Sequence, residues 1–221
     1  MPRPSQNIDE ALLRSGLALL PQFGCSGLSV RRVAEHAGVN PAMFHYHFLS
    51  KAVFLRAVLQ QLYETMFAQL SAGAAREGPA LDRLKAALEA IARFAREHHA
   101  LIGRLVIDAA SGEAVVREFV RANAPRHLGL LLQLLAEAEA TGELPPAPPL
   151  QRFVFLMGSV LSPMLVAPAV AALQVSPMAS RPLLEAQVLS DAAIEQRVRW
   201  ALNALLAAGS EDKPKTKRRA R

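Results

Sequence analysis

The chain has 221 residues, of which 52% are hydrophobic and 20% charged, enough for one substantial core or a small domain beside a larger one. Alanine and leucine dominate and aromatic residues reach only 5%, which favours an all-α protein. The single cysteine, Cys25, excludes an internal disulfide, and the first residues contain no apolar signal-peptide core. We therefore expect a reducing, cytoplasmic location.

The net charge of +6 is concentrated at the two ends of the chain. Residues 1–60 carry six Lys and Arg against three acidic residues, and residues 210–221 carry six against two. A basic head on a nearly neutral body is typical of a nucleic-acid-binding domain beside a separate body. The basic tail has too little to bury and is predicted to be disordered; it either adds salt-sensitive attraction to DNA or is only solvated.

Apolar residues recur with helical spacing from the start of the chain and predict a first helix over residues 8–23. Ser29 is a good N-cap for a second helix, which ends before Gly38. Asn40 can cap a short third helix that begins at Pro41, a residue that suits the first position of a helix.

The rest of the chain predicts six more helices, for a total of about nine. The fourth begins after the cap residue Ser50, and the seventh is expected to be interrupted at Pro125. The loops between them are rich in glycine and proline. The six helices are expected at residues 51–70, 81–94, 101–110, 113–140, 150–171 and 191–208, with loops that include residues 73–80 and 172–190.

The turn between the second and third predicted helices, residues 37–40, has the length of the turn in a helix-turn-helix. Val33, Val39 and Phe44 are the apolar residues that would pack the two helices together. Gly38 lies where such a turn needs a positive φ, which glycine adopts without steric cost. The pattern therefore predicts a helix-turn-helix.

Three cations stand at predicted helix starts, where they oppose the helix dipole. Arg31 and Arg32 lie in the first turn of the second helix, and Lys51 lies in the first turn of the fourth. This placement is reasonable if a phosphate binds at these helix starts, where free N–H groups already favour an anion.

The stretch GLSVRRVAEHAGVNPAMFHYHFLSKAVFLRAV resembles the DNA-binding segment of the TetR family of bacterial transcriptional regulators. The resemblance covers about residues 8–60. Its most specific parts are Ser29, Val33–Ala34, Ala37–Gly38–Val39 and the end that runs from His47–Phe48 to Ser50–Lys51. The remainder is similar to the family only in length and helical character.

This resemblance implies a homodimer that inserts its third helix into the major grooves of a palindromic double-stranded DNA operator. By position, Arg31 is expected to read a base edge, and an apolar tip is expected to face the groove. The residues expected to contact DNA are Ser29, Arg31, Pro41, Ala42, Met43, His45, Tyr46 and Lys51. His45, Met43 and Leu49 depart from the common family pattern, which leaves the operator sequence open.

Histidines in the third predicted helix raise the alternative of a metal site. His45 and His47 are two residues apart and so point about 200° apart on a helix, which prevents them from sharing one ion. We therefore expect no metal and no cofactor, and interpret His47, Phe44 and Phe48 as packed residues.

The resemblance further implies a C-terminal helical domain that binds a small, lipophilic inducer and dimerises. The domains are expected at residues 1–50, 51–209 and 210–221. The eighth and ninth predicted helices, 150–171 and 191–208, are expected to form the dimer interface as a four-helix bundle. The expected pocket residues, each of which could equally be plain core, are Met66, Phe67, Phe94, His98, Arg104, Ile107 and Phe155.

The expected function is that of a repressor that an inducer releases from DNA, and there are two alternatives to it. Motifs such as GxSxG and GxxxxGK[ST] are missing, so an enzyme is not expected, and a non-regulatory helical binding protein remains the other alternative. Residues 153–180 contain no charged residue and are long enough to span a membrane, but Pro163 and Pro168 interrupt them, which favours a buried or interface helix.

Overall fold

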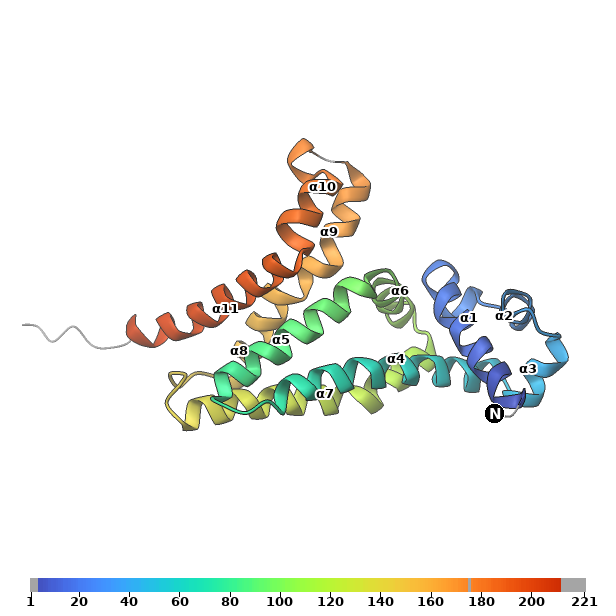
Figure 1. The fold of residues 1–221 in the computed structure, drawn as a ribbon, viewed down its shortest axis with the longest axis horizontal. Helices are drawn as coiled ribbons and strands as arrows, with labels where there is room; N and C mark the ends of the chain where they lie inside the picture. Colours follow the sequence, from blue (N-terminus) through green and yellow to red (C-terminus); the bar gives the residue numbers. More distant parts are fainter. Residues whose placement is uncertain (1–3, 175, 212–221) are drawn as a thin grey trace, which may run out of the picture. The chain divides into compact units, whose positions relative to one another are not determined.

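The computed structural model describes residues 4–174 and 176–211, with side chains for residues 8–174 and 176–207. Every regular element in these ranges is helical (Figure 1), so the all-α prediction is confirmed. The described ranges contain eleven α-helical elements, two more than expected. The difference arises where one predicted helix is split and where a predicted loop forms a short helix.

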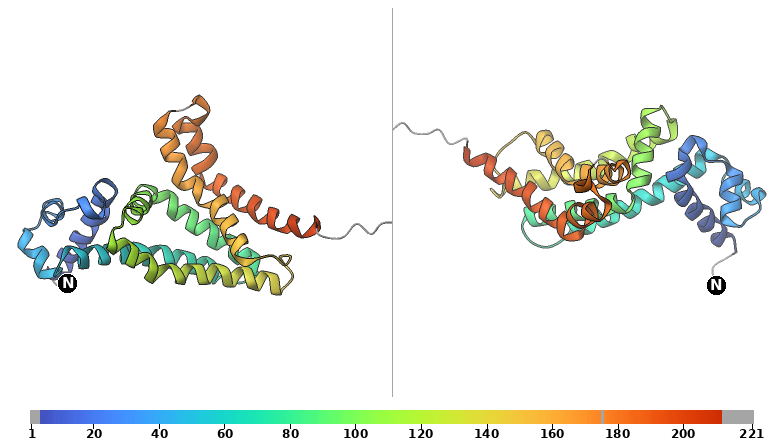
Figure 2. Two further views of the ribbon diagram at one scale, coloured as in Figure 1. Left: turned by 180° about the vertical axis from the view of Figure 1, so that it is seen from behind. Right: turned by 90° about the horizontal axis from the view of Figure 1, so that it is seen from above.

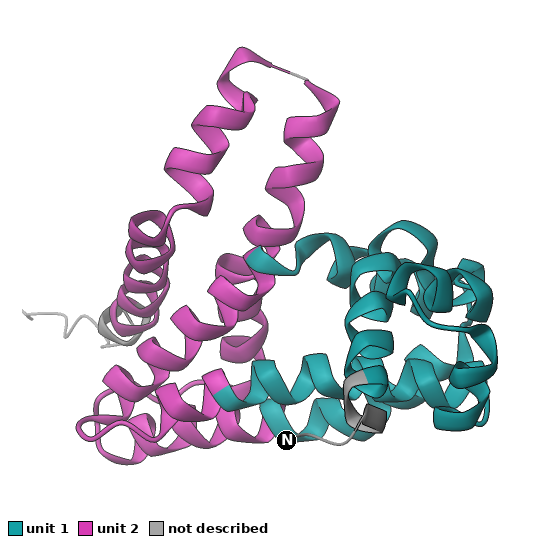
Figure 3. Cartoon of the chain, turned by 45° about the vertical axis from the view of Figure 1, so that its right-hand side comes forward, with its two compact units in different colours: residues 1–68, 97–127 teal, residues 69–96, 128–221 magenta. Residues whose placement is uncertain are grey.

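Two compact units make up the chain (Figure 3). Unit 1 contains residues 1–68 and 97–127, and unit 2 contains residues 69–96 and 128–221. The long helices of the middle region contribute to both units, so the units do not correspond to a single boundary such as the one expected after residue 50. The separate domain expected at residues 1–50 stays a prediction.

Unit 1 begins with three helices, α1 (Pro4–Gly27), α2 (Val30–Ala37) and α3 (Pro41–His47). α1 contains a kink at Gly24, whose φ of 64° and ψ of 178° are not helical, so its first regular helix ends close to the predicted end at residue 23. Apolar side chains from α1 to α4 form the core of this part of the unit, and the largest of them are fully buried. They are Leu12, Leu20, Leu28, Phe44, Phe54, Leu55 and Leu59.

Four further helices follow: α4 (Lys51–Ala74), α5 (Ala80–Glu97), α6 (His99–Ala110) and α7 (Ala114–Ala140). The Ser50 hydroxyl accepts a hydrogen bond from the Val53 N–H at 3.3 Å and so caps α4 as predicted. α7 is continuous through Pro125, so the proline does not end this helix.

The prediction of one continuous apolar helix at residues 150–171 is wrong. The structure has two helices, α8 (Pro149–Val160) and α9 (Ser162–Leu173), separated by Leu161. Pro163 explains the break, because it lacks the N–H that a continuous helix would need and its ring crowds the preceding turn. Residues 149–173 have the length and composition of a membrane span, with 22% of the tested window buried.

The loop predicted at residues 172–190 is also partly wrong. It contains the 3-10 turn η1 (Pro177–Ala179), the short helix α10 (Arg181–Leu184) and the π-helical turn η2 (Glu185–Leu189). α10 and η2 pack against α9 to form a helical arm (Figures 1 and 2). Pro182 misled the prediction, because proline is well tolerated in the first turn of a helix.

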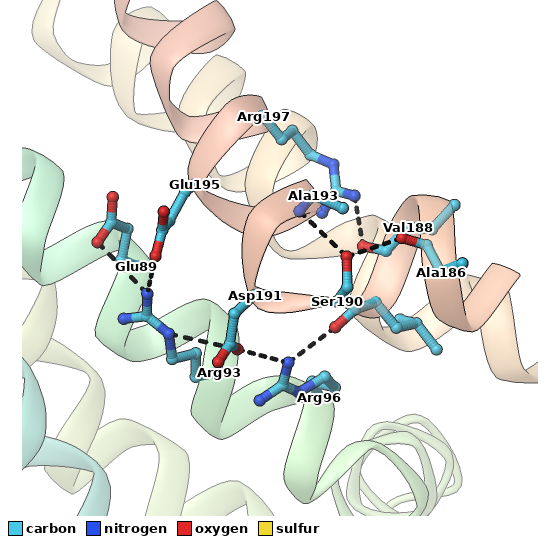
Figure 4. Close-up of polar contacts among 11 residues, drawn as sticks. Glu89, Arg93, Arg96, Ala186, Val188, Ser190, Asp191, Ala193, Glu195 and Arg197 are labelled. Carbon is cyan, nitrogen blue, oxygen red and sulfur yellow. Dashed lines mark hydrogen bonds and ion pairs between the residues drawn. The ribbon is translucent and has the colours of Figure 1, made fainter.

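The last helix, α11 (Asp191–Glu211), packs against α8 within unit 2. Arg96 on α5 holds the start of this helix (Figure 4). Its guanidinium forms an ion pair with Asp191 at 2.7 Å and donates a hydrogen bond to the Leu189 carbonyl, just before α11, at 2.8 Å. Arg93 contacts Glu195 at 3.0 Å. The predicted tail begins inside α11, and residues 212–221 lie outside the described residues.

Candidate nucleic-acid interface

Local hydrogen bonds that the sequence predicts hold both the start of α2 and the turn between α2 and α3. The Ser29 hydroxyl accepts a hydrogen bond from the Arg32 N–H at 3.2 Å and caps α2. Gly38 adopts φ 69° and ψ 28°, the left-handed conformation, and the Val39 N–H donates to the Ala34 carbonyl at 3.0 Å. A side chain at Gly38 would strain this turn, so the glycine fixes how α3 leaves α2.

α3 buries one side and exposes the other. The Asn40 side chain accepts a hydrogen bond from the Ala42 N–H at 2.9 Å and caps the helix, with Pro41 at its first position. Phe44 is fully buried, and its ring centroid lies 5.0 Å from that of Phe54 on α4. The aromatic packing fixes the rotation of α3 about its own axis.

The outward side of α3 carries most of the residues that the sequence assigned to DNA. Pro41, Ala42 and His45 are exposed, and Tyr46 is 77% exposed. Met43 is only half-buried, so it contributes both to the core and to this surface. The structure therefore brings these five residues together on one short helix.

The two neighbouring arginines of α2 have different surroundings. The Arg31 side chain is 83% exposed, and its Nε donates to Glu35 at 2.6 Å. This hydrogen bond and the charge of Glu35 raise the pKa of Arg31. The Arg32 guanidinium instead lies 3.8 Å from the centroid of the Phe23 ring on α1. Arg31 is thus the arginine of this pair that reaches outward.

Lys51 is half-buried and makes a contact that the sequence did not predict. Its ammonium group donates to the Ser26 carbonyl at 2.8 Å, which ties the start of α4 to the end of α1. Because an ammonium group has three donors, two remain for a phosphate. Lys51 therefore lies where a phosphate contact is compatible with its structural contact.

His47 lies behind the exposed surface, as expected. Its side chain is buried and its Nδ1 contacts the Asp9 carboxylate of α1. Phe48 is buried beside Phe54. Within the part of the chain that the structure describes, no group of three or more His, Cys, Asp and Glu side chains is placed to hold a metal.

Sequence reasoning missed Asp108, a buried carboxylate on α6. It accepts hydrogen bonds from the Cys25 N–H at 2.7 Å and from Arg104 Nε at 3.0 Å. Its side chain therefore joins α6 to the end of α1. The available signal was a lone acidic residue in the apolar stretch LIGRLVIDAA, since a carboxylate at a buried position needs hydrogen-bond donors.

The residues expected to line a ligand pocket have unequal surroundings. Met66 and Phe94 are buried, Phe67 is half-buried, and Ile107 is 57% exposed. His98 is at the N-cap position of α6, although its side chain does not cap the helix. Five of the seven belong to unit 1, whereas Phe94 and Phe155 belong to unit 2. The shared pocket therefore stays a prediction.

A polar cluster joins α4 and α7 within unit 1. The Tyr63 hydroxyl donates to the Asn123 carbonyl at 2.8 Å, and the buried Asn123 side chain exchanges hydrogen bonds with Gln60. His127 lies beside Tyr63, and burial lowers its pKa. Arg126 places its guanidinium 4.2 Å from the Phe67 ring centroid and pairs with Glu64 at 2.6 Å.

This geometry defines the class of the protein: it is all-helical and contains a helix-turn-helix. Residues 12–58 match the family model of the bacterial regulatory proteins of the tetR family. The tetracycline repressor protein class C of Escherichia coli is 42% identical over 57 residues, which cover 26% of this chain and 24% of that protein. Both matches lie in the helix-turn-helix segment, so it is residues 12–58 that resemble the DNA-binding segment of the TetR family.

Solved structures show that the likeness in fold extends over most of the chain. The transcriptional regulator FadR from Bacillus subtilis, in complex with stearoyl-CoA, is 13% identical with a TM-score of 0.67, covering 90% of this chain and 98% of that one. A TetR family transcription regulator from Marinobacter aquaeolei is 17% identical with a TM-score of 0.66, covering 90% and 96%.

Proposed function

We propose that the protein is a dimeric, ligand-responsive transcriptional regulator whose α3 enters the major groove of a palindromic operator. The observation that carries this proposal is the exposed side of α3, from Pro41 to Tyr46, which follows the glycine turn of a helix-turn-helix. The proposal includes no enzymatic activity. It places the protein in the cytoplasm, without attachment to a membrane.

Base reading in this proposal falls to Arg31. Its exposed guanidinium must exchange Glu35 for the acceptors of a guanine, and because that pair is solvent-exposed the exchange costs little. Ser29, His45, Tyr46 and Lys51 hold phosphates, while Pro41, Ala42 and Met43 offer apolar contact to thymine methyl groups. Ser29 already uses its hydroxyl as a cap acceptor, so its proton is the part available to a phosphate.

Dimerisation is assigned to the apolar helices of unit 2. α8, α9 and α11 expose large apolar side chains that a second copy would cover: Val154, Val166, Trp200 and Leu206. Isologous packing of α8 and α11 with their counterparts, as a four-helix bundle, is the simplest arrangement. A palindromic operator takes two copies of α3 about one turn of DNA, or 34 Å, apart.

Release by an inducer is assigned to α6. Arg104, one of the expected pocket residues, donates to Asp108, and Asp108 in turn holds the Cys25 N–H at the end of α1. A ligand that displaces Arg104 would change the support of α1 and thereby of α3, with loss of operator affinity. A lipophilic inducer is favoured by the apolar middle of the chain, and the Bacillus subtilis relative with stearoyl-CoA supports that class.

Arg31→Ala tests the DNA-binding role. We expect operator affinity to fall by about 1–3 kcal/mol, with relaxed sequence preference at one position in each half-site. The measurement is fluorescence anisotropy with the palindrome found upstream of the regulator's own gene, and with scrambled DNA of the same length. Sedimentation and circular dichroism check that the dimer and its helices remain.

Arg181→Ala is the matched control. Arg181 on α10 and Glu185 at the start of η2 form an i,i+4 pair like that of Arg31 and Glu35, at 2.8 Å against 2.6 Å. The side chains of Arg181 and Arg31 are 82% and 83% exposed. Loss of this pair should leave operator affinity unchanged. Equal effects of the two substitutions, or no effect of Arg31→Ala, would remove Arg31 from the interface.

A further inference from the structure

α8 contains a single charged residue, Arg152, and its side chain is buried. The sequence of α8 is PLQRFVFLMGSV, and Arg152 is 3% exposed. Burial of a guanidinium is costly unless hydrogen bonds and an opposite charge compensate it. The contacts of Arg152 therefore indicate what this position is built to hold.

Only part of the guanidinium is satisfied by the described protein atoms. Arg152 Nη1 donates to Glu139 Oε2 on α7 at 2.6 Å. Arg152 Nη2 is buried and has no acceptor among the described residues. An Arg side chain offers five N–H donors in a planar fork that suits a carboxylate. The Nη2 side of the fork is therefore a pair of N–H donors without an acceptor among the described residues.

Arg152 lies in the wall of a hollow between α8 and α11. The hollow has a volume of about 280 Å³, just below the range of about 300–1,000 Å³ that is usual for small-molecule sites. Its remaining walls are mainly apolar. The lining residues are Ala147, Gln151, Arg152, Phe155, Ala204 and Leu205.

We propose that this hollow binds a small monocarboxylate with an apolar body. The carboxylate accepts hydrogen bonds from the free side of the Arg152 fork, and the apolar body lies against Phe155 and Leu205. Gln151 and Phe155 are exposed, and the proposal requires that side chains in the wall turn aside so that the buried Nη2 reaches the ligand. The site belongs to unit 2 and is independent of the DNA contacts of α3.

A second copy of the chain does not supply this carboxylate if α8 and α11 pack on their own counterparts. Residues 149–160 of α8 and residues 198–207 of α11 contain neither Asp nor Glu. These two stretches of a second copy therefore offer no carboxylate to the hollow. The small volume and apolar walls favour a compact acid of the size of a substituted benzoate over a larger or more highly charged anion.

Glu139 limits the affinity. Its carboxylate is bound to the other side of the same guanidinium, so the ligand is a second anion on one cation. Glu139→Gln removes this competing charge and leaves Arg152 without an ionic partner among the residues that the structure describes. The proposal therefore expects binding to become tighter in this variant, an effect opposite to that of simple structural damage.

The test is isothermal titration calorimetry of the full-length protein with 4-butylbenzoate, and with 4-butylbenzamide as the neutral analogue. We expect saturable binding of the benzoate only, loss of at least about tenfold in Arg152→Gln, and a severalfold gain in Glu139→Gln. Equal binding of the amide, or no saturable binding of the benzoate at millimolar concentration, would overturn the proposal.

Because Arg152→Gln could disturb folding, a second pair of variants avoids the buried arginine. Ala204→Phe fills the hollow from α11, whereas Ala192→Phe places the same side chain at an exposed position of α11 outside its lining. Loss of benzoate binding in the first variant alone supports the site. Equal binding by both variants contradicts it.

Discussion

Cys25 lies where the end of α1 meets α6. The thiol is fully buried, and its backbone N–H donates to Asp108. Burial, followed by the negative charge of Asp108, raises the pKa of Cys25 to about 12. Since the thiolate is the nucleophile, the folded protein holds its single cysteine in an unreactive form at neutral pH.

Alkylation of Cys25 should therefore report unfolding or the opening of this contact. At pH 8, iodoacetamide is expected to label the native protein at least about a hundredfold more slowly than the protein in guanidinium chloride. Mass spectrometry over time measures the rate. Native labelling as fast as that of the unfolded chain would show that α1 does not hold Cys25 closed.

His127 gives the protein a pH dependence in the α4–α7 pairing. Burial lowers its pKa in the folded state below the ordinary value of about 6.5, so the unfolded chain binds the proton more readily. The stability that neutral His127 contributes is thus present above that value and is lost as the pH falls below it.

We predict that the melting temperature of the wild type falls more between pH 7.5 and pH 5.5 than that of His127→Gln. Thermal denaturation by circular dichroism at both pH values measures the difference. His45→Gln, a change at an exposed histidine, should keep the wild-type pH dependence. Parallel losses in all three proteins would exclude His127 as the cause.

The roles of individual side chains at the candidate interface were only partly predictable. Exposure of His45 and Tyr46 and burial of Phe44 follow from helical spacing around one fixed core residue. Arg31 and Arg32 are adjacent and chemically equal, so only the position of the Phe23 ring decides which of them turns back onto the protein. The contact of Lys51 with the Ser26 carbonyl is long-range and leaves no local signal.

At the scale of elements, α4 and α5 approach closely at Gly73. A Cβ atom at this position would lie 2.9 Å from backbone atoms of Ala86 and Ala87 on α5. Backbone atoms cannot move aside as a flexible side chain can, so the glycine sets how near the two helices lie.

Gly73→Ala should destabilise the protein by about 1–3 kcal/mol, because the added methyl group pushes the helices apart. Gly129→Ala is the control, since Gly129 is an exposed position in α7 with no atom within 4 Å of the added Cβ. It should stabilise the protein by about 0.5–1 kcal/mol through helix propensity alone. Chemical denaturation of both variants measures the difference, and an equal response would contradict the close approach.

Helix starts were predictable from sequence to a greater degree than helix continuity. Ser29, Asn40 and Ser50 are local signals, and all three accept the expected capping hydrogen bond. Proline has no single meaning: α7 continues through Pro125, whereas Pro163 accompanies a break. The difference depends on whether neighbouring structure compensates the missing N–H, which the local sequence does not contain.

For the whole molecule, the apolar surface of α8 and α11 makes dimerisation testable. Val154 on α8 and Val106 on α6 are each 60% exposed and so form a matched pair. Val154→Asp should shift the protein to monomer, because it places a charge in the proposed interface, whereas Val106→Asp should leave the dimer intact. Sedimentation velocity over a range of concentrations distinguishes these outcomes, and a dimer that survives Val154→Asp would move the interface elsewhere.

The fold class and the position of the helix-turn-helix were predictable, because helical periodicity and turn chemistry are written in neighbouring residues. The two compact units were not, since unit 1 combines residues 1–68 with residues 97–127. The apolar pattern predicts which face of a helix is buried, but not which other helix packs against it. Contacts over such separations depend on shape complementarity between the helices.

Trp200 has a consequence for how this protein can be observed. It is the chain's single tryptophan, lies on α11 with 63% of its surface exposed, and precedes Ala204 of the hollow by one helical turn. All indole fluorescence therefore comes from one position on the proposed dimer surface. Its emission provides an internal optical signal, without any attached dye, for the covering of α11 by a second copy.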